Sequence, residues 1–134
     1  MLKIEINTKP IVKRLSDIRD NLSDFSPLFS ILRREFLQKR IREIFGTNGY
    51  GRWLPTTRPN PILRDTRALY RSYTQIGAAG NINIETSNSL IWGSDISYAH
   101  YHEYGTSRLT PREVISMLDT TEVTRITEEW VNSL

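Results

Sequence analysis

Two apolar stripes near the start of the chain, separated by Ser26-Pro27, constrain the fold more than any other feature of the sequence. The first repeats at spacings of four and three and predicts an amphipathic helix over about Thr8 to Asp24. The second predicts a helix over about Pro27 to Phe45, which Ser26-Pro27 starts and Gly46 ends. The first stripe is Ile11, Leu15, Ile18, Leu22 and Phe25, and the second is Leu28, Leu32, Phe36 or Leu37, Ile41 and Ile44.

The sequence also predicts a small antiparallel sheet. Residues 81–86 alternate with period two, and Leu90 to Gly93 follows a Ser87-Asn88-Ser89 turn, which is typical of a β-hairpin. This hairpin is expected to give the sheet its centre. Residues 1–6 alternate polar and apolar side chains instead of forming one apolar run, so they predict an edge strand and not a secretory signal.

Three further helical segments complete the prediction. Asp65 is expected to cap a short helix that contains Leu69, Tyr70 and Tyr73 and ends before Gly77. Tyr98 to Tyr104 predicts one or two helical turns that Gly105 ends, and the capping box of residues 119–122 opens a last helix. That helix buries Val123, Ile126 and Trp130.

The predicted fold class is therefore α+β, with N-terminal helices packed on a small antiparallel β-sheet and a C-terminal helix. The 134 residues are expected to form one domain, 1–134. It divides into a helical part over about 8–45, a long loop at 46–61 and a mixed helix and strand part at 62–134.

Composition excludes several classes of protein. Apolar residues make up 38% and charged residues 25%, as in soluble globular proteins, and no apolar run reaches the roughly 20 residues of a membrane span. We therefore expect no membrane partner. The chain has no cysteine, which excludes disulfides and thiolate zinc sites and fits the cytoplasm. A net charge of +3 is small for a dedicated nucleic-acid binder, although it tolerates DNA nearby.

The long loop of residues 46–61 contains three glycines, three prolines and two asparagines, so regular structure is not expected there. A loop of this length is usually functional or ordered by a partner. Trp53 has two possible roles. It can anchor the loop on the core, which we favour, or it can serve as an interface residue.

No group of residues has the spacing of a catalytic, cofactor or metal site, and we predict that the chain is not an enzyme. His100-x-His102-Glu103 lacks the ligands of a zinc site, and phosphate-binding glycine loops are missing. His102 and Glu103 are expected to hydrogen-bond within a packed turn, and a hydrolase that uses both is a further alternative. Glu128-Glu129 predicts a solvated face.

Basic residues gather in two places. One cluster lies in the second predicted helix and the other runs through the central loop and short helix, among Tyr50, Trp53, Tyr70 and Tyr73. Most such clusters are solvated or paired with acids, but aromatic neighbours also allow stacking on nucleic acid. A small nucleic-acid-binding module is therefore the alternative function. The clusters are Arg33, Arg34, Lys39, Arg40 and Arg42, and Arg52, Arg58, Arg64, Arg67 and Arg71.

Five short segments follow one another between Arg52 and Arg112. They are Trp53-Leu54-Pro55, residues 62–66 (Ile-Leu-Arg-Asp-Thr) with Leu69, Trp92-Gly93-Ser94, Tyr98-Ala99-x-x-His102-Glu103-x-Gly105, and Pro111-Arg112. In this order and spacing they resemble the phage virion-morphogenesis family, the tail-completion or neck proteins of Mu-like tailed bacteriophages. The resemblance covers about the last two thirds of the chain.

The resemblance implies a structural virion protein at the head-tail junction or tail end, acting as a tail completion, terminator or connector component. It implies partners as well: copies of the chain in a ring of six or twelve, adjacent neck and tail-tube proteins, and passing phage DNA at most non-specifically. Its expected location is the neck or tail of the virion, after assembly in the host cytoplasm. The predicted interface residues are Trp53, Arg58, Tyr98, His102, Tyr104 and Arg112, and the predicted DNA-channel residues are Arg64, Arg67 and Arg71.

Overall fold

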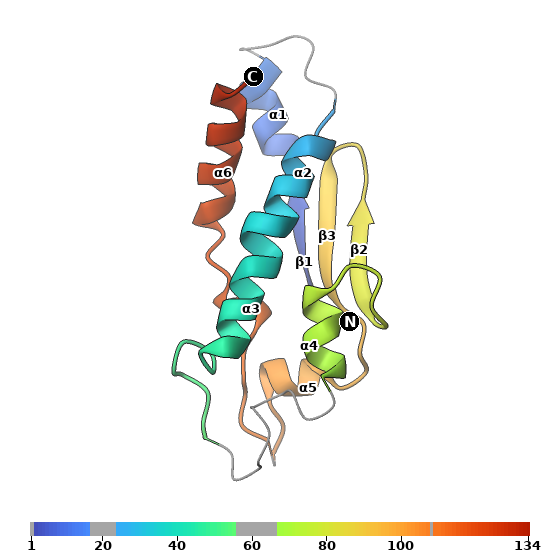
Figure 1. Ribbon diagram of the computed structural model, residues 1–134, viewed down its shortest axis with the longest axis vertical. Helices are drawn as coiled ribbons and strands as arrows, with labels where there is room; N and C mark the ends of the chain where they lie inside the picture. Colours follow the sequence, from blue (N-terminus) through green and yellow to red (C-terminus); the bar gives the residue numbers. More distant parts are fainter. Residues whose placement is uncertain (1, 17–23, 56–66, 108) are drawn as a thin grey trace.

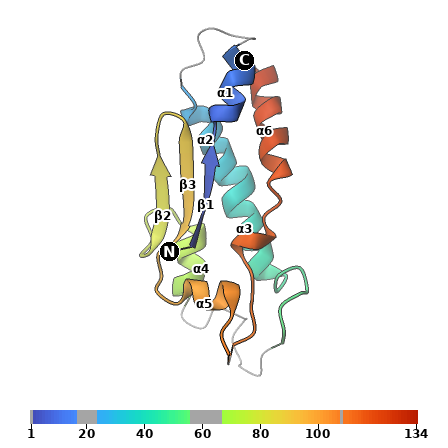
Figure 2. The same ribbon diagram turned by 180° about the vertical axis from the view of Figure 1, so that it is seen from behind.

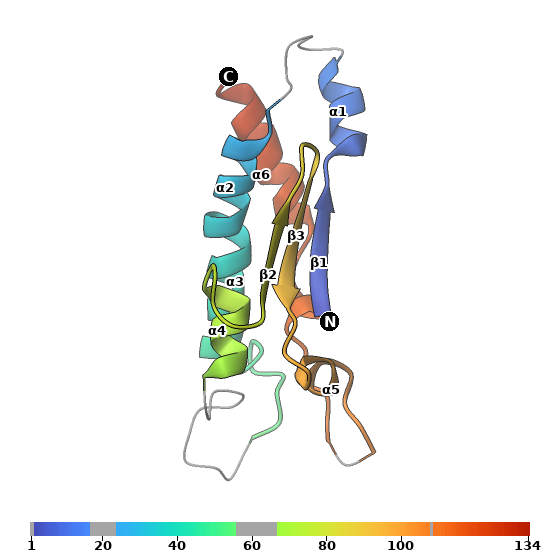
Figure 3. The same cartoon turned by 90° about the vertical axis from the view of Figure 1, so that its right-hand side faces the viewer.

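The computed structural model describes residues 2–16, 24–55, 67–107 and 109–134 and has the predicted α+β class. Residues 26–46 form one long helix, which we call the long helix. This helix and α4 (Ala68–Thr74), the helix after it, lie on one side of a three-stranded sheet (Figures 1 and 3). In chain order the elements are β1 (Leu2–Asn7), α1 (Lys9–Ser16), α2 (Ser26–Leu32), η1 (Arg33–Gln38), α3 (Lys39–Gly46), α4 (Ala68–Thr74), β2 (Asn81–Glu85), β3 (Ser89–Ser94), α5 (Ala99–Tyr104), η2 (Ile115–Met117) and α6 (Thr121–Asn132).

The sheet has the order β1-β3-β2 and both pairings are antiparallel. The predicted hairpin is confirmed, with β3 in the centre and β1 at one edge. The side chains of Leu90, Trp92 and Ser94 are fully buried and face the helices, because alternate residues of a strand point to one face. Seen from behind, none of the described helices crosses the other face of the sheet between α1 at one end and α5 at the other (Figure 2).

The second predicted helix is confirmed as one continuous helix of three segments, α2, η1 and α3. Its middle segment, η1, is a π-helix. A π-helical turn holds one residue more than an α-helical turn, so it shifts the faces of the residues that follow. This explains why Phe36 and Leu37, which the apolar stripe offered as alternatives, are both fully buried.

The start of this helix differs from the prediction. Ser26 was expected to cap it, but the cap position is Phe25 and no side chain caps it. The hydroxyl of Ser26 instead donates to Glu85 of β2 at 3.1 Å, and Asp24 Oδ1 accepts the backbone N–H of Ser26 at 3.0 Å. Ser26 is therefore the first residue of α2, and its hydroxyl binds an acceptor on the sheet instead of the free N–H groups of the helix.

The first predicted helix is confirmed only as α1, over Lys9–Ser16. Residues 17–23 lie outside the described residues, and Asp24, the predicted last residue, is not helical. The side chain of Asn7 accepts the backbone N–H of Lys9 at 2.9 Å, so it satisfies one of the free donors at the start of α1.

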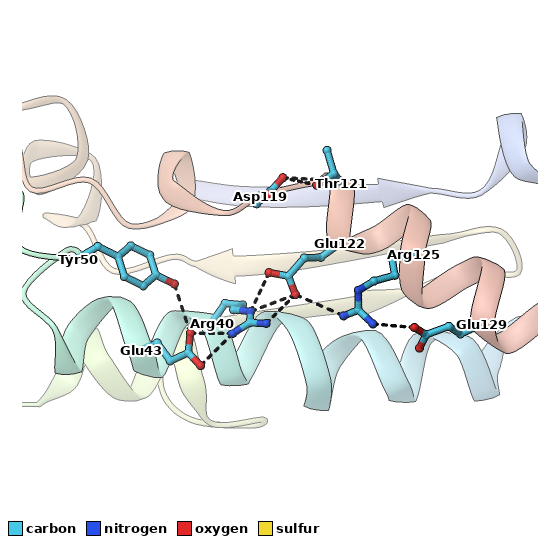
Figure 4. A network of polar contacts seen from close by, with 8 residues as sticks. All are labelled: Arg40, Glu43, Tyr50, Asp119, Thr121, Glu122, Arg125 and Glu129. Atoms are coloured by element: carbon cyan, nitrogen blue, oxygen red, sulfur yellow. Dashed lines mark hydrogen bonds and ion pairs between the residues drawn. The ribbon is translucent and has the colours of Figure 1, made fainter.

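The C-terminal helix is confirmed, but its predicted capping box does not form, since the cap position is Thr120 and no side chain caps the helix. Asp119 Oδ1 accepts the backbone N–H of Thr121 at 3.0 Å and its hydroxyl at 2.7 Å. Glu122 does not turn back to the helix start, because it binds Arg40 of α3 at 2.8 Å (Figure 4). Arg40 also binds Glu43 at 2.9 Å, so α6 is clamped to the long helix by a charged network.

Polar contacts fix α4 on the sheet and on the long helix. Trp92 Nε1 donates to the carbonyl of Tyr73 at 2.9 Å, and the hydroxyls of Ser72 and Ser94 share a hydrogen bond of 2.7 Å. Gln38 donates to the carbonyl of Thr74 at 2.9 Å. The cap position of α4 is Arg67, with φ +61°, and the predicted cap Asp65 lies outside the described residues.

Candidate functional site

Three of the segments that carry the family resemblance meet at one end of the molecule, away from the C-terminus (Figure 3). We call this region the loop end and define it as residues 47–55, 98–107 and 109–113. It contains Trp53, Tyr98, His102, Tyr104 and Arg112, which are the predicted interface residues other than Arg58. Arg58 lies outside the described residues.

Trp53 anchors the long loop, which is the role we favoured from the sequence. Its side chain is 5% exposed, and its ring lies edge-on to Phe45 with centroids 5.5 Å apart. The indole Nε1 donates to the carbonyl of Glu113 at 2.9 Å. The indole ring is therefore covered, and a partner would meet the loop that Trp53 holds in place.

Arg112 joins the same loop to the returning chain. Its Nη2 donates to the carbonyl of Leu54 at 3.0 Å, and its backbone N–H donates to the carbonyl of His102 at 2.6 Å. Gly105 ends α5 with φ +75°, and a Cβ there would lie 2.7 Å from the carbonyl oxygen of Leu109. Hydrogen bonds of Arg112 therefore join residues 47–55, α5 and residues 109–113 to one another.

Glu103 fixes α5 to the segment that leads to α6. Its side chain is buried at 2% exposure, and its Oε2 accepts the backbone N–H of Val114 at 2.7 Å. Its Oε1 accepts both the backbone N–H and the hydroxyl of Ser116 at 2.8 Å. Glu103 is thus buried and hydrogen-bonded, but its partners lie in residues 114–116 and not, as predicted from the sequence, in its own turn. Burial, followed by the negative charge of Glu103, raises the pKa of the nearby Tyr73 hydroxyl.

This arrangement bears on the hydrolase alternative, which needs His102 to point toward a cleft beside a carboxylate that orients it. His102 is half-buried, and its ring stands edge-on to Tyr98 at 5.8 Å. The Glu103 carboxylate is already occupied by donors from residues 114–116. Over the described part of the chain, no three His, Asp or Glu side chains come together in a way that could hold a metal ion.

The surface of the loop end is rich in tyrosine. Tyr98, Tyr101 and Tyr104 are 38%, 48% and 69% exposed. Their spacing of three places them on one side of α5. Leu54, at 52% exposure, adds an aliphatic side chain to the loop end. Tyr101 was not among the predicted interface residues, although the repeat of tyrosine at every third position from 98 to 104 could have revealed it.

The predicted DNA-channel residues are only partly described. Arg64 lies outside the described residues, whereas Arg67 lies exposed at the cap position of α4 and Arg71 lies exposed within that helix. Within residues 2–16, 24–55, 67–107 and 109–134, neither arginine forms an ion pair. In the long helix, by contrast, Arg33, Arg34 and Arg40 all pair with acids of the same chain.

A groove of about 480 Å³ runs between the long helix and α6. Charged residues of both signs line it, including Arg40, Arg125 and Glu129, and these belong to the network of Figure 4. Because those charges already satisfy one another, the groove is a weaker candidate than the loop end. The predicted solvated face of α6 is confirmed, since Glu128 and Glu129 are both exposed.

The chain matches no protein-family model, no curated protein and no solved structure in the three comparisons made with it. Its role is therefore inferred from its own residues and contacts. None of the helices in the described ranges is long and apolar enough to cross a membrane.

Proposed function

We propose that this chain is a structural subunit of a tailed bacteriophage, which assembles with copies of itself into a ring at the head-tail junction or at the tail end. One observation carries the proposal. Segments around Trp53, His102 and Arg112, which resemble the virion-morphogenesis family in order and spacing, are joined at the loop end by direct hydrogen bonds.

The loop end has the chemistry of an association surface. The contacts of Trp53, Glu103 and Arg112 hold its backbone in place, so a partner would not have to order it. Exposed tyrosines supply large apolar area together with a hydroxyl, and such residues are enriched at protein interfaces. If this surface meets a different surface of the next copy, the contact is heterologous and closes a ring when the rotation between copies allows it.

Substitution of the tyrosines tests the proposal. In Tyr101→Ser/Tyr104→Ser the exposed rings are removed without opening the core, so the fold is retained and ring assembly weakens by at least about tenfold in concentration. The matched control is Ile76→Ser, which removes an apolar side chain of 58% exposure from the turn after α4. Light scattering and electron microscopy would report rings for wild type and control. Equal assembly by all three proteins would contradict the role of the loop end.

The alternative function, a small nucleic-acid-binding module, has one observation in its favour. Arg67, at the cap of α4, and Arg71, within α4, are exposed and form no ion pair with any other described residue. Binding of this kind would weaken steeply with salt, because phosphate contacts release counterions. Retention of the chain on DNA that falls with salt and is reduced in Arg71→Ser would favour this function, and no retention at low salt would exclude it.

A further inference from the structure

The two edges of the sheet differ in how they are protected from pairing with another chain. On β1 the exposed side chains include Lys3 and Glu5, and charged residues of this kind discourage edge pairing. The other edge, β2, carries Ile84 on the outer face at 51% exposure, whereas Ile82 on the same face is covered at 7% exposure. No lysine, arginine or proline interrupts β2. Figure 2 shows β2 at the outer margin of the sheet.

The hydrogen-bond pattern of the hairpin identifies the backbone groups that β2 presents outward. The N–H of Thr86 donates to the carbonyl of Ser89 at 2.9 Å, so these two residues form a hydrogen-bonded pair. Such pairs alternate along an antiparallel ladder, which directs the N–H and C=O of Ile84 toward β3. Those of Asn83 and Glu85 therefore point away from the sheet. No other described residue forms a backbone hydrogen bond with them on that side.

Side chains of the long helix bind the β2 side chains that point toward it and so fix the conformation of this edge. Arg33 Nε donates to Asn83 Oδ1 at 2.8 Å, and Arg33 Nη2 binds Glu85 Oε1 at 2.6 Å. Ser26 also donates to Glu85 at 3.1 Å. The one charged side chain of β2 is thus turned toward the long helix and does not protect the outer face.

We propose that β2 pairs antiparallel with β2 of a second copy, about a two-fold axis at Ile84, so that two three-stranded sheets become one continuous sheet. In this register each Asn83 stands opposite Glu85 of the partner subunit, and all four outward N–H and C=O groups of the two residues are satisfied in each copy. Ile84 then stands directly opposite Ile84 of the partner subunit. The backbones of these two residues form no hydrogen bond with each other, and in pairs of this kind the side chains approach most closely.

Two observations select a second copy and this register. A two-fold axis at Asn83 would instead pair Glu85 with Asn81, whose N–H already donates to the carbonyl of Ala78 at 2.9 Å. The register at Ile84 avoids that conflict. It also places each Glu85 opposite Asn83 of the partner subunit, which is bound by Arg33 of the partner subunit. The Glu85 carboxylate therefore lies near a positive charge, and the Glu85 carboxylates of the two copies do not stand directly opposite each other.

The first test places a charge on the edge. Ile84→Lys leaves the fold intact because the side chain is half exposed, and it raises the dissociation constant of the dimer by at least about tenfold in sedimentation measurements over about 1 to 100 µM. The control is Leu54→Lys, which adds the same charge at a side chain of 52% exposure in the loop end. Ile84→Lys should keep the loop-end ring contact and lose the edge contact, whereas Leu54→Lys should do the reverse. A wild-type protein that stays monomeric, or equal dissociation constants for wild type and Ile84→Lys, would overturn the proposal.

The second test uses the absence of cysteine from the sequence. In Ile84→Cys the only thiol of each copy faces its counterpart at a separation within reach of a disulfide, so mild oxidation gives a covalent dimer that reductant reverses. The matched control is Glu5→Cys, because Glu5 lies in the same cross-strand row as Ile84 but on the opposite edge. A yield at least about tenfold above the control supports the pairing. Equal yields from both variants would refute it.

Discussion

At the scale of single residues, the long loop depends on a run of left-handed backbone beneath one tryptophan. Asn48, Gly49, Tyr50 and Gly51 all have positive φ, at 52°, 67°, 54° and 80°. Of the two glycines, only Gly49 lies against the Trp53 ring, since a Cβ at that position would be 2.4 Å from Cδ1 of the indole. The two glycines therefore share a backbone requirement, whereas the steric requirement belongs to Gly49 alone.

This difference predicts unequal effects of the same substitution. Gly51→Ala adds only the strain of an L-residue at positive φ, about 1 kcal/mol, because no atom lies within 4 Å of its Cβ. Gly49→Ala adds that strain and a clash with Trp53, about 1 to 3 kcal/mol more. Urea unfolding of both variants measures the difference in the free energy of unfolding. Equal losses would mean that Trp53 does not hold the loop as described.

Glu103 gives a second prediction for single residues. Glu103→Ala leaves the buried N–H of Val114 without its acceptor and lowers the free energy of unfolding by about 2 to 3 kcal/mol. Glu113→Ala, which removes an exposed glutamate ten residues later, is the control and should change the free energy of unfolding by less than about 0.5 kcal/mol. Thermal or urea unfolding compares them. Similar small effects at both positions would show that the hydrogen bonds of Glu103 do not stabilise the contact between α5 and residues 114–116.

At the scale of elements, the start of α6 should depend on pH. Hydrogen bonds from the hydroxyl and the backbone N–H of Thr121 lower the pKa of Asp119 below its ordinary value of 3.8. A carboxylate with a lowered pKa in the folded state stabilises the fold above its unfolded pKa, and that contribution disappears as the pH falls through the folded pKa.

The prediction is a stability difference that acid removes. Wild type should melt at a higher temperature than Asp119→Asn near about pH 6, and the two melting temperatures should converge below about pH 4 as Asp119 protonates. Thermal melts of both proteins across this range test it. A gap that stayed constant down to about pH 2.5 would contradict a role for the Asp119 charge.

The elements themselves were largely predictable, because they follow from local patterns. Period-two alternation placed β2, the turn at residues 87–89 placed β3, and the apolar stripe placed the long helix. The caps were less predictable, since Ser26 and Glu122 bind Glu85 and Arg40, which are distant in sequence. A stripe counted at 3.6 residues per turn also could not reveal the π-helical turn, although the ambiguity between Phe36 and Leu37 marked its place.

At the scale of the whole molecule, the two surfaces described here lie on different parts of the fold. The loop end gathers its residues from segments far apart in sequence, so the sequence could suggest Trp53, Tyr98 and Arg112 but not that hydrogen bonds join their segments. The β2 edge depends on strand order, since β2 lies at the margin only because β1 pairs with the other side of β3. Such relations depend on tertiary structure, which short sequence patterns do not encode.

The most direct test of the proposed assembly is to mix the purified chain with the heads and with the tail tubes of the tailed bacteriophage to which the proposal assigns it. The mass by light scattering and the particles by electron microscopy are then compared with those of the chain alone. We predict rings with a defined number of copies, bound at the neck or at the tail end. A chain that binds neither heads nor tail tubes, and that forms no ring at any concentration, would contradict the assembly role.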